Sequence, residues 1–307
     1  MESFSFIHPP VYDHKKNFGQ KLVSPVFLGL VFTFVIAAVV ILTMWYNRDI
    51  PYHSPGPNPD LNPIMWVAGD IHVGFFSEPY EGYHFKQFVE DLESLNMGNS
   101  VVFLGDLMED DLSFVPPFNN IANRLLLNWT YVLGNHDFHK STNEPLFPPR
   151  YFAQTVHGIR FIFISDESGL SRNLVMTTAQ QEWFFDELRA SIDQPVFIFS
   201  HQPYYEVEMW KELRAQLDSF SITAWFSAHK HNWDIKPDTG FGFPNIGLHS
   251  IGGIRAAYSS SFLSMSRSED MVDVQVCFRN HYRQQWIKVD KLDDFQFSVS
   301  LNASREN

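Results

Sequence analysis

Short apolar segments alternate with amphipathic segments over most of the chain after residue 63. The apolar segments 64–69, 101–105 and 130–134 have the length of strands, and segments with helical spacing around 83–96 and 117–127 separate them. Because parallel strands need a crossover connection, which is usually a helix, this order predicts a βαβ sheet with both of its faces covered. The repeated pattern therefore restricts this part of the chain to an α/β fold.

The alternation continues in the second half of the chain. Residues 151–165 are predicted to form two strands that turn at His157-Gly158, and residues 177–191 have the spacing of a helix. Two more strands, with a helix between them, are predicted at 195–200 and 222–228.

The C-terminal part has no helical spacing. A Ser-rich loop is predicted at 259–268, and antiparallel strands are predicted to follow it at 271–278, 284–290 and 294–300. Added to the α/β part, these strands predict a two-sheet β-sandwich flanked by helices.

An uncharged apolar run of 21 residues occupies positions 26–46. As a helix it would span ~31 Å, about the thickness of a bilayer core. A cleaved signal peptide is the alternative, but its apolar region is shorter and small residues follow it, whereas bulky Met44, Trp45 and Tyr46 end this run. We therefore expect residues 25–46 to form an uncleaved transmembrane anchor.

Charged residues around this anchor predict its orientation. Lys15, Lys16 and Lys21 precede it, whereas only Arg48, beside Asp49, follows it. Because cytoplasmic flanks are enriched in Lys and Arg, residues 1–24 are expected to be a short cytoplasmic tail. The chain is then a single-pass membrane protein with a lumenal or extracellular catalytic domain.

The segment after the anchor separates it from the globular part. Residues 47–63 are rich in proline and predict an extended stalk, so the folded domain covers 64–307. The acceptor triplets Asn128-Trp-Thr and Asn302-Ala-Ser agree with a lumenal or extracellular domain and predict a glycoprotein.

Composition excludes some partners. The 22 basic and 35 acidic residues give a net charge of -13, and no basic cluster could follow a phosphate backbone, so no nucleic acid partner is expected. Cys277 stands alone, so no intrachain disulfide can form.

Residues able to bind metals follow five of the predicted strands. In an extended segment residues i and i+2 point the same way, so Asp70 with His72, and His229 with His231, can each serve one site. A lone residue of this kind is more often a solvated loop residue, and Gly-Asn-His-Asp alone is equally well an ordinary polar turn. Their succession at strand ends instead predicts a metal site, to which the strand ends offer the metal-capable residues Asp70, His72, Asp106, Asn135, His136, His201, His229 and His231.

The ligand types narrow the chemistry of that site. Imidazole, carboxylate and amide donors without cysteine suit Zn, Mn or Fe. A bridging carboxylate would hold two divalent ions about 3.5–4 Å apart, an arrangement that suits displacement at phosphorus. The sequence therefore predicts phosphoester hydrolysis.

The ordered set Asp-x-His, Gly-Asp-x-x-Glu, Gly-Asn-His-Asp, His and His-x-His resembles the calcineurin-like metallophosphoesterase superfamily. The resemblance implies that His136 protonates the leaving oxygen with Asp137 orienting its ring, while a metal-bridging hydroxide attacks phosphorus. It also implies Asp106 as the bridge between two ions. The first ion would be held by Asp70, His72, Asp106 and His231, and the second by Asp106, Asn135, His201 and His229.

Three positions differ from the family pattern or have an open role. Ala228 stands where the family has glycine before His-x-His, which should shift the loop without removing a ligand. Glu109 is expected to bond to loop backbone and not to act directly. Purple acid phosphatases place a tyrosine ligand to iron there, so Glu109 argues against that branch. Asp166 is expected to be structural.

The function predicted from these features is a membrane-anchored phosphoesterase that hydrolyses a phosphomonoester or phosphodiester. The tether favours a lipid-linked or membrane-proximal phosphoester substrate. A catalytically inactive metal-binding scaffold or partner module of the same fold is one alternative, and a phosphate sensor is another. His136 and Asp137 argue against both, because neither needs an acid near a leaving group.

Overall fold

The computed structural model covers the folded domain in nine segments. The predicted tail 1–24, anchor 25–46 and stalk up to residue 62 lie outside these segments, all of which belong to one compact unit, 50–307. Among the described residues, no helix has both the length and the apolar character needed to cross a bilayer. The described residues are 63–74, 82–169, 172–207, 210–236, 242–252, 259–268, 270–280, 285–286 and 296–300.

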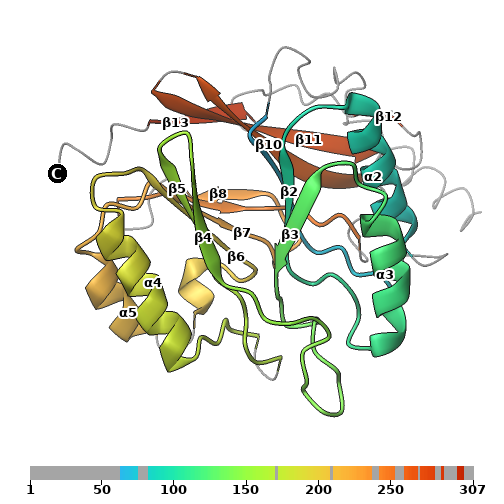
Figure 1. Cartoon of the computed structure of the whole chain (residues 1–307), viewed down its shortest axis with the longest axis horizontal. Helices are drawn as coiled ribbons and strands as arrows, with labels where there is room; N and C mark the ends of the chain where they lie inside the picture. Colours follow the sequence, from blue (N-terminus) through green and yellow to red (C-terminus); the bar gives the residue numbers. More distant parts are fainter. Residues whose placement is uncertain are drawn as a thin grey trace, which may run out of the picture. The chain divides into compact units, whose positions relative to one another are not determined.

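The first of two sheets combines the first three strands of the domain with the C-terminal strands (Figure 1). β1, β2 and β3 are parallel, and β10 joins β1 in antiparallel orientation. In spatial order its strands are β12 (Gln285–Trp286), β11 (Met271–Asn280), β10 (Ser259–Ser268), β1 (Met65–Ala68), β2 (Ser100–Leu104) and β3 (Asn128–Val132), with β13 (Gln296–Ser300) also pairing with β11.

The second sheet contains the strands from the middle of the chain. β5, β6, β7 and β9 are parallel, and β4 and β8 are antiparallel to their neighbours at the two edges. In spatial order its strands are β4 (Phe152–Val156), β5 (Ile159–Phe163), β6 (Val196–Ser200), β7 (Ala224–Ser227), β9 (Asn245–Gly247) and β8 (Asp234–Lys236).

Helices cover the outer faces of both sheets (Figure 1). The first sheet packs against α2 (Tyr83–Leu95) and α3 (Val115–Ala122), and the second against α4 (Thr178–Ala190) and α5 (Trp210–Leu217). Two short 3-10 helices, η1 (Leu112–Phe114) and η2 (Tyr204–Glu206), precede α3 and α5.

Side chains alternate between the two faces of each strand, and they form three hydrophobic core layers. Trp66 and Ala68 of β1 pack against α2 and α3, whereas Met65 and Val67 point the other way, toward the inner face of the second sheet. Since successive side chains of a strand point to opposite faces, a strand with helices on one side and a sheet on the other must be apolar throughout. The expected two-sheet sandwich flanked by helices is confirmed for the described residues.

The Ser-rich segment 259–268 is a strand and not the predicted loop. It lies between β1 and β11, which supply hydrogen-bond partners to both of its edges. Phe262 packs in the layer below α2, and Leu263 and Met265 pack between the sheets. Burial on both faces outweighs the turn preference of serine, so the local composition was misleading.

The predicted turn at His157-Gly158 is confirmed, whereas the bounds predicted for the helix around 117–127 are wrong. The β4–β5 turn falls at His157 and Gly158, whose φ values of 52° and 79° suit a tight two-residue hairpin turn. The helix predicted around 117–127 instead spans 115–122, because Pro116 and Pro117 are well suited to a first helical turn, whereas the following residues leave the helix.

Candidate metal centre

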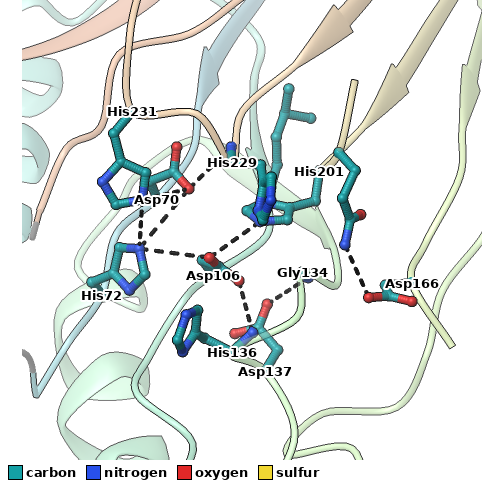
Figure 2. A network of polar contacts seen from close by, with 12 residues as sticks. Asp70, His72, Asp106, Gly134, His136, Asp137, Asp166, His201, His229 and His231 are labelled. Atoms are coloured by element: carbon teal, nitrogen blue, oxygen red, sulfur yellow. Dashed lines mark hydrogen bonds and ion pairs between the residues drawn. The ribbon is translucent and has the colours of Figure 1, made fainter. Parts of the chain in front are cut away.

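The predicted ligands come together at the carboxyl ends of five strands. Asp70 and Asp106 follow β1 and β2 in the first sheet, and His201 and His229 follow β6 and β7 in the second. Parallel strands bring their carboxyl ends to one edge of each sheet, and stacking of the two sheets brings the edges together. Figure 2 shows the side chains converging from both sheets.

One cluster combines four residues from three loops, those after β1, β2 and β7. The ligand atoms of Asp70, His72, Asp106 and His231 all lie within 4.8 Å of one another. His72 Nε2 is 3.1 Å from His231 Nε2 and 3.6 Å from Asp106 Oδ2, and His231 Nε2 is 3.4 Å from Asp70 Oδ1. These atoms converge on a common point, as ligands of one ion would.

A second cluster shares Asp106 with the first. His201 Nε2 lies 3.1 Å from Asp106 Oδ2 and 3.2 Å from His229 Nδ1. Asn135 follows Gly134 in the loop after β3, and its Oδ1 is buried without a hydrogen-bond partner among the described residues. Asp106 Oδ2 therefore lies between the histidines of the two clusters, where a bridging ligand has to be.

The backbone at these residues is strained. Asp70, His72, Asp106, His229 and His231 all have φ between 49° and 68°, the left-handed region. Each such residue costs about 1–2 kcal/mol, and such strain persists mainly at functional sites. The expected reason for the i, i+2 pairing was therefore wrong, because Asp70 with His72 and His229 with His231 share a site through left-handed turns and not through extended backbone.

The donor set fits divalent metal ions. Asp70 Oδ2 and Asn135 Oδ1 are buried oxygens that lack a hydrogen-bond partner within the described segments. Leaving such atoms unpaired costs about 1–3 kcal/mol each, a penalty that coordination to a cation would remove. Oxygen and imidazole nitrogen donors in this proportion suit Zn, Mn or Fe.

Charges in the clusters are strongly coupled. Burial raises the pKa of Asp106, but the charge and hydrogen bond of His201 outweigh burial and hold that pKa well below its usual range. Burial lowers the pKa of His201, yet Asp106 raises it to about 10. Protons and metal ions compete for these donors, so ion binding must release protons.

Gly105 and Gly134, which directly precede Asp106 and Asn135, allow the loops after β2 and β3 to approach each other closely. A Cβ on Gly134 would lie 2.4 Å from Asp106 Oδ1 and 2.7 Å from His201 Cδ2, and one on Gly105 would lie 2.5 Å from Gly134 N. Side chains there would push apart the loops after β2 and β3. The glycine in Gly-Asn-His-Asp thus serves the approach of two loops as well as a turn.

The expectation that Asp137 orients the ring of His136 is wrong. Asp137 is fully buried, and its carboxylate accepts hydrogen bonds from the backbone N–H of Leu107 (2.7 Å), Met108 (3.3 Å) and Gly134 (2.9 Å). It joins the loops after β2 and β3. The nearest acceptor for His136 Nδ1 is instead Asp110 Oδ1, at 3.1 Å.

Glu109 also differs from its expected role. Oε1 lies 2.5 Å from His72 Nδ1 and Oε2 lies 3.5 Å from His136 Nδ1, so its carboxylate faces two imidazole rings and not loop backbone. Glu109, Asp110 and His136 form a third group of close donor atoms. The sequence could have indicated this only through the run of acidic residues Glu109 to Asp111 after Asp106.

Ala228 packs directly against the loop after β1. Its N–H donates to His201 O at 2.8 Å, and a Cβ on Gly69 would lie only 2.6 Å from Ala228 Cβ. The methyl group thus fills the space beside Gly69 while His229 and His231 remain in the site.

We expect Gly69→Ala to lower the free energy of unfolding by about 1–3 kcal/mol, because the added methyl group overpacks this contact. Chemical unfolding of the full chain in detergent measures the loss. Ala228→Gly in the same chain should restore most of it, since it removes the clashing methyl group. A double variant as unstable as Gly69→Ala would contradict the packing explanation.

Asp166 is buried beside the site and bonds to loops, as expected. Its Oδ1 accepts from the N–H of Ser168 and Val175, each at 3.1 Å, and its Oδ2 accepts from Gln202 Nε2 at 3.1 Å. Burial outweighs these bonds and raises the pKa of Asp166 to about 7. The folded state therefore binds this proton more tightly than the unfolded state.

We expect Asp166→Asn to stabilise the protein above about pH 7. A carboxyl group with a raised pKa contributes stability below its unfolded pKa, and that contribution is lost as pH rises through the folded pKa. A rise in the pKa of Asp166 from 3.8 to about 7 corresponds to ~4 kcal/mol of unfolding free energy. The difference in unfolding free energy between variant and wild type should grow from about pH 4 to about pH 7, and a pH-independent difference would refute this.

The chain has detectable sequence similarity to mammalian acid phosphatases. It is 23% identical over 189 residues to tartrate-resistant acid phosphatase type 5 of Rattus norvegicus, covering 48% of this chain and 58% of that protein. The Mus musculus protein of the same name is 22% identical over 240 residues, covering 62% and 73%. The chain thus matches less than two-thirds of the rat protein.

Solved structures with detectable similarity include Vps29 of Chaetomium thermophilum. It has a TM-score of 0.42 and 14% identity, and the alignment covers 77% of this chain and 98% of that chain. A metallophosphoesterase from Sphaerobacter thermophilus has a TM-score of 0.31 and 8% identity over 77% of this chain and 88% of that chain. The family model for calcineurin-like phosphoesterases matches residues 65–233, more than half of the chain. The chain therefore belongs to the calcineurin-like phosphoesterase family.

Proposed function

We propose that this protein is a membrane-anchored, dinuclear metal-dependent phosphoesterase that hydrolyses a phosphomonoester or phosphodiester. The observation that carries the proposal is the position of Asp106 Oδ2, which lies 3.6 Å from His72 Nε2 and 3.1 Å from His201 Nε2. A carboxylate between two groups of ligands suits a pair of ions sharing one bridge.

The residues divide naturally between two ions. When bound, divalent ions would supply Lewis acidity to the phosphoryl oxygens and an activated water as nucleophile. The first ion would be held by Asp70, His72, Asp106 and His231, and the second by Asp106, Asn135, His201 and His229.

His136 is placed to handle the proton of the leaving group. Its side chain is 36% exposed, and its ring centroid lies 5.3 Å from that of His72. Because Nδ1 faces Asp110, Nε2 is the ring nitrogen left to hold a proton for the leaving oxygen. The N–H of His136 donates to Asp106 Oδ1 at 2.9 Å, which fixes the loop beside the bridge.

Hydrolysis by the full-length chain in detergent tests the proposal. The metal-stripped protein is assayed on a chromogenic phosphodiester and monoester, with Mn, Zn or Fe added back. Turnover that requires a metal supports the proposal, and the ratio of the two rates narrows the substrate. Two bound ions without cleavage of either ester would favour the inactive scaffold.

The anchor and orientation form a separate part of the proposal. A single-pass topology with the domain lumenal or extracellular is supported by the apolar run at 26–46 and its basic flank. Such a tether suits a lipid-linked or membrane-proximal phosphoester. Asn128 is exposed at the start of β3, where a glycan could be attached, whereas Asn302 lies outside the described residues.

Glycosylation in a eukaryotic host tests the orientation. We expect glycosidase treatment to reduce the apparent mass, and Asn128→Gln to remove part of that shift. Together with resistance of the domain to protease in sealed vesicles, this result supports lumenal placement. Digestion of the domain by protease added on the cytoplasmic side would contradict it.

A further inference from the structure

Two carboxylates lie behind ligand histidines, one in each cluster. Glu109 Oε1 is 2.5 Å from His72 Nδ1, and Glu206 Oε2 is 3.6 Å from His229 Nε2. Glu109 comes from the loop after β2, and Glu206 ends η2 in the loop after β6. Neither residue belongs to the ligand sets given above.

The two histidines use opposite ring nitrogens, yet each turns its outer nitrogen toward a glutamate. His72 points Nε2 at Asp106 and His231, which leaves Nδ1 for Glu109. His229 points Nδ1 at His201 Nε2, 3.2 Å away, which leaves Nε2 for Glu206. Because both histidines have a glutamate at the outer nitrogen although their rings are oppositely oriented, the two glutamates share one role.

His201 shows the same requirement met in another way. Its Nδ1 donates to the backbone carbonyl of Leu104 at 2.7 Å, so Nε2 is left to face Asp106. A proton on the outer nitrogen leaves the lone pair of the inner nitrogen free for an ion, and an acceptor behind the ring fixes that tautomer.

Glu206 is held in place by its own contacts. Oε1 forms an ion pair with Lys230, which stands between His229 and His231 in the sequence, and the backbone carbonyl accepts from Leu174 N–H at 2.8 Å. Oε2 is buried and has no hydrogen-bond partner within the described segments. A buried carboxylate oxygen of this kind needs a donor, and His229 Nε2–H is positioned to become one.

We propose that Glu109 and Glu206 are positioning residues that each fix the tautomer and ring orientation of one ligand histidine, Glu109 for the first ion and Glu206 for the second. The inference rests on the proposed function. Loss of such a partner typically lowers metal affinity 10- to 100-fold. Each glutamate should therefore control the affinity of its own subsite and leave the other unchanged.

Chains with one intact subsite separate the two effects. His201→Ala removes a ligand of the second ion only, and His231→Ala removes a ligand of the first ion only. Binding of Mn²⁺ to the full-length, metal-stripped chain in detergent is then measured by electron paramagnetic resonance. Glu109→Gln should weaken binding about 10- to 100-fold beside His201→Ala and leave it unchanged beside His231→Ala, and Glu206→Gln should show the reverse.

Lys230→Gln provides a matched control. It breaks the Glu206–Lys230 ion pair but leaves the carboxylate behind His229, so affinity at the second subsite should fall much less than in Glu206→Gln. An equal loss would assign the effect to the ion pair. Unchanged affinity in both glutamine variants, or equal weakening of both subsites by either one, would overturn the inference.

Histidine tautomers in the unmodified ligand set give a second test that requires no variant to fold. With Zn²⁺ bound to ¹⁵N-histidine-labelled protein, we expect the proton on Nδ1 of His72 and on Nε2 of His229. The opposite tautomer at either residue would refute its assigned glutamate. Failure of the wild-type protein to take up two ions would contradict the proposed function as well. Normal hydrolysis by the wild type, together with unaltered subsite affinities in the two glutamine variants, would contradict this inference alone.

Discussion

Asp106→Asn is expected to reduce phosphoester hydrolysis by about three orders of magnitude and to disturb both metal ions. Asp106 Oδ2 faces histidines of both clusters, and an amide is a much weaker bridge than a carboxylate. The metal ions would stabilise the transition state, and a loss of several kcal/mol of that stabilisation corresponds to a rate effect of this size. The measurement combines kcat/KM with metal content after dialysis.

Asp91→Asn is the matched control for this prediction. Asp91 is also a buried carboxylate, but it lies on α2, outside both clusters. Its metal content and activity should remain those of the wild type. Wild-type occupancy by two ions in Asp106→Asn would reject the bridging role of that residue.

His136→Asn is expected to slow hydrolysis of an alkyl phosphoester by about 100-fold or more while both ions remain bound. Asparagine cannot donate a proton to the leaving oxygen, and general acid catalysis typically contributes 10²–10⁴-fold. With a nitrophenyl ester the loss should be much smaller, because nitrophenolate leaves without protonation. The comparison of kcat on the two esters measures this difference.

The dependence on the leaving group distinguishes an acid from a structural residue. His157→Asn, in the exposed β4–β5 turn, is the matched control and should leave both rates unchanged. Equal losses on the two esters in His136→Asn would remove His136 from the proton transfer. Asp110→Asn should show the same pattern with a smaller loss, because Asp110 acts only through the ring of His136.

Most strands and their ends were predictable from local pattern. Segments such as 64–69 and 196–199 are apolar throughout because both faces are buried, and their length sets them apart from helices. Parallel pairing then brings the residues after each strand to one edge. The positions of Asp70, Asp106 and His201 follow from these two facts.

The contacts of the histidine rings in the site were not predictable from local sequence pattern. Asp137 is adjacent to His136 in sequence, yet it turns inward to accept backbone N–H groups of the loop after β2. Asp110, from another loop and with a φ of 42°, faces the ring instead. Adjacency in sequence says little about side-chain direction in loops, where no repeating backbone geometry sets it.

The sequence by itself determined the α/β order of elements, the ordered set of ligand types and the family they resemble, because hydrophobic periodicity and motif spacing are local properties. Only the tertiary structure decided that segment 259–268 is a central strand, that the ligand pairs lie on left-handed backbone, and that Glu109, Asp110 and Glu206 face histidine rings. Those features depend on partners distant in the chain. Packing between sheets and loops supplies the hydrogen bonds and burial that outweigh local preference.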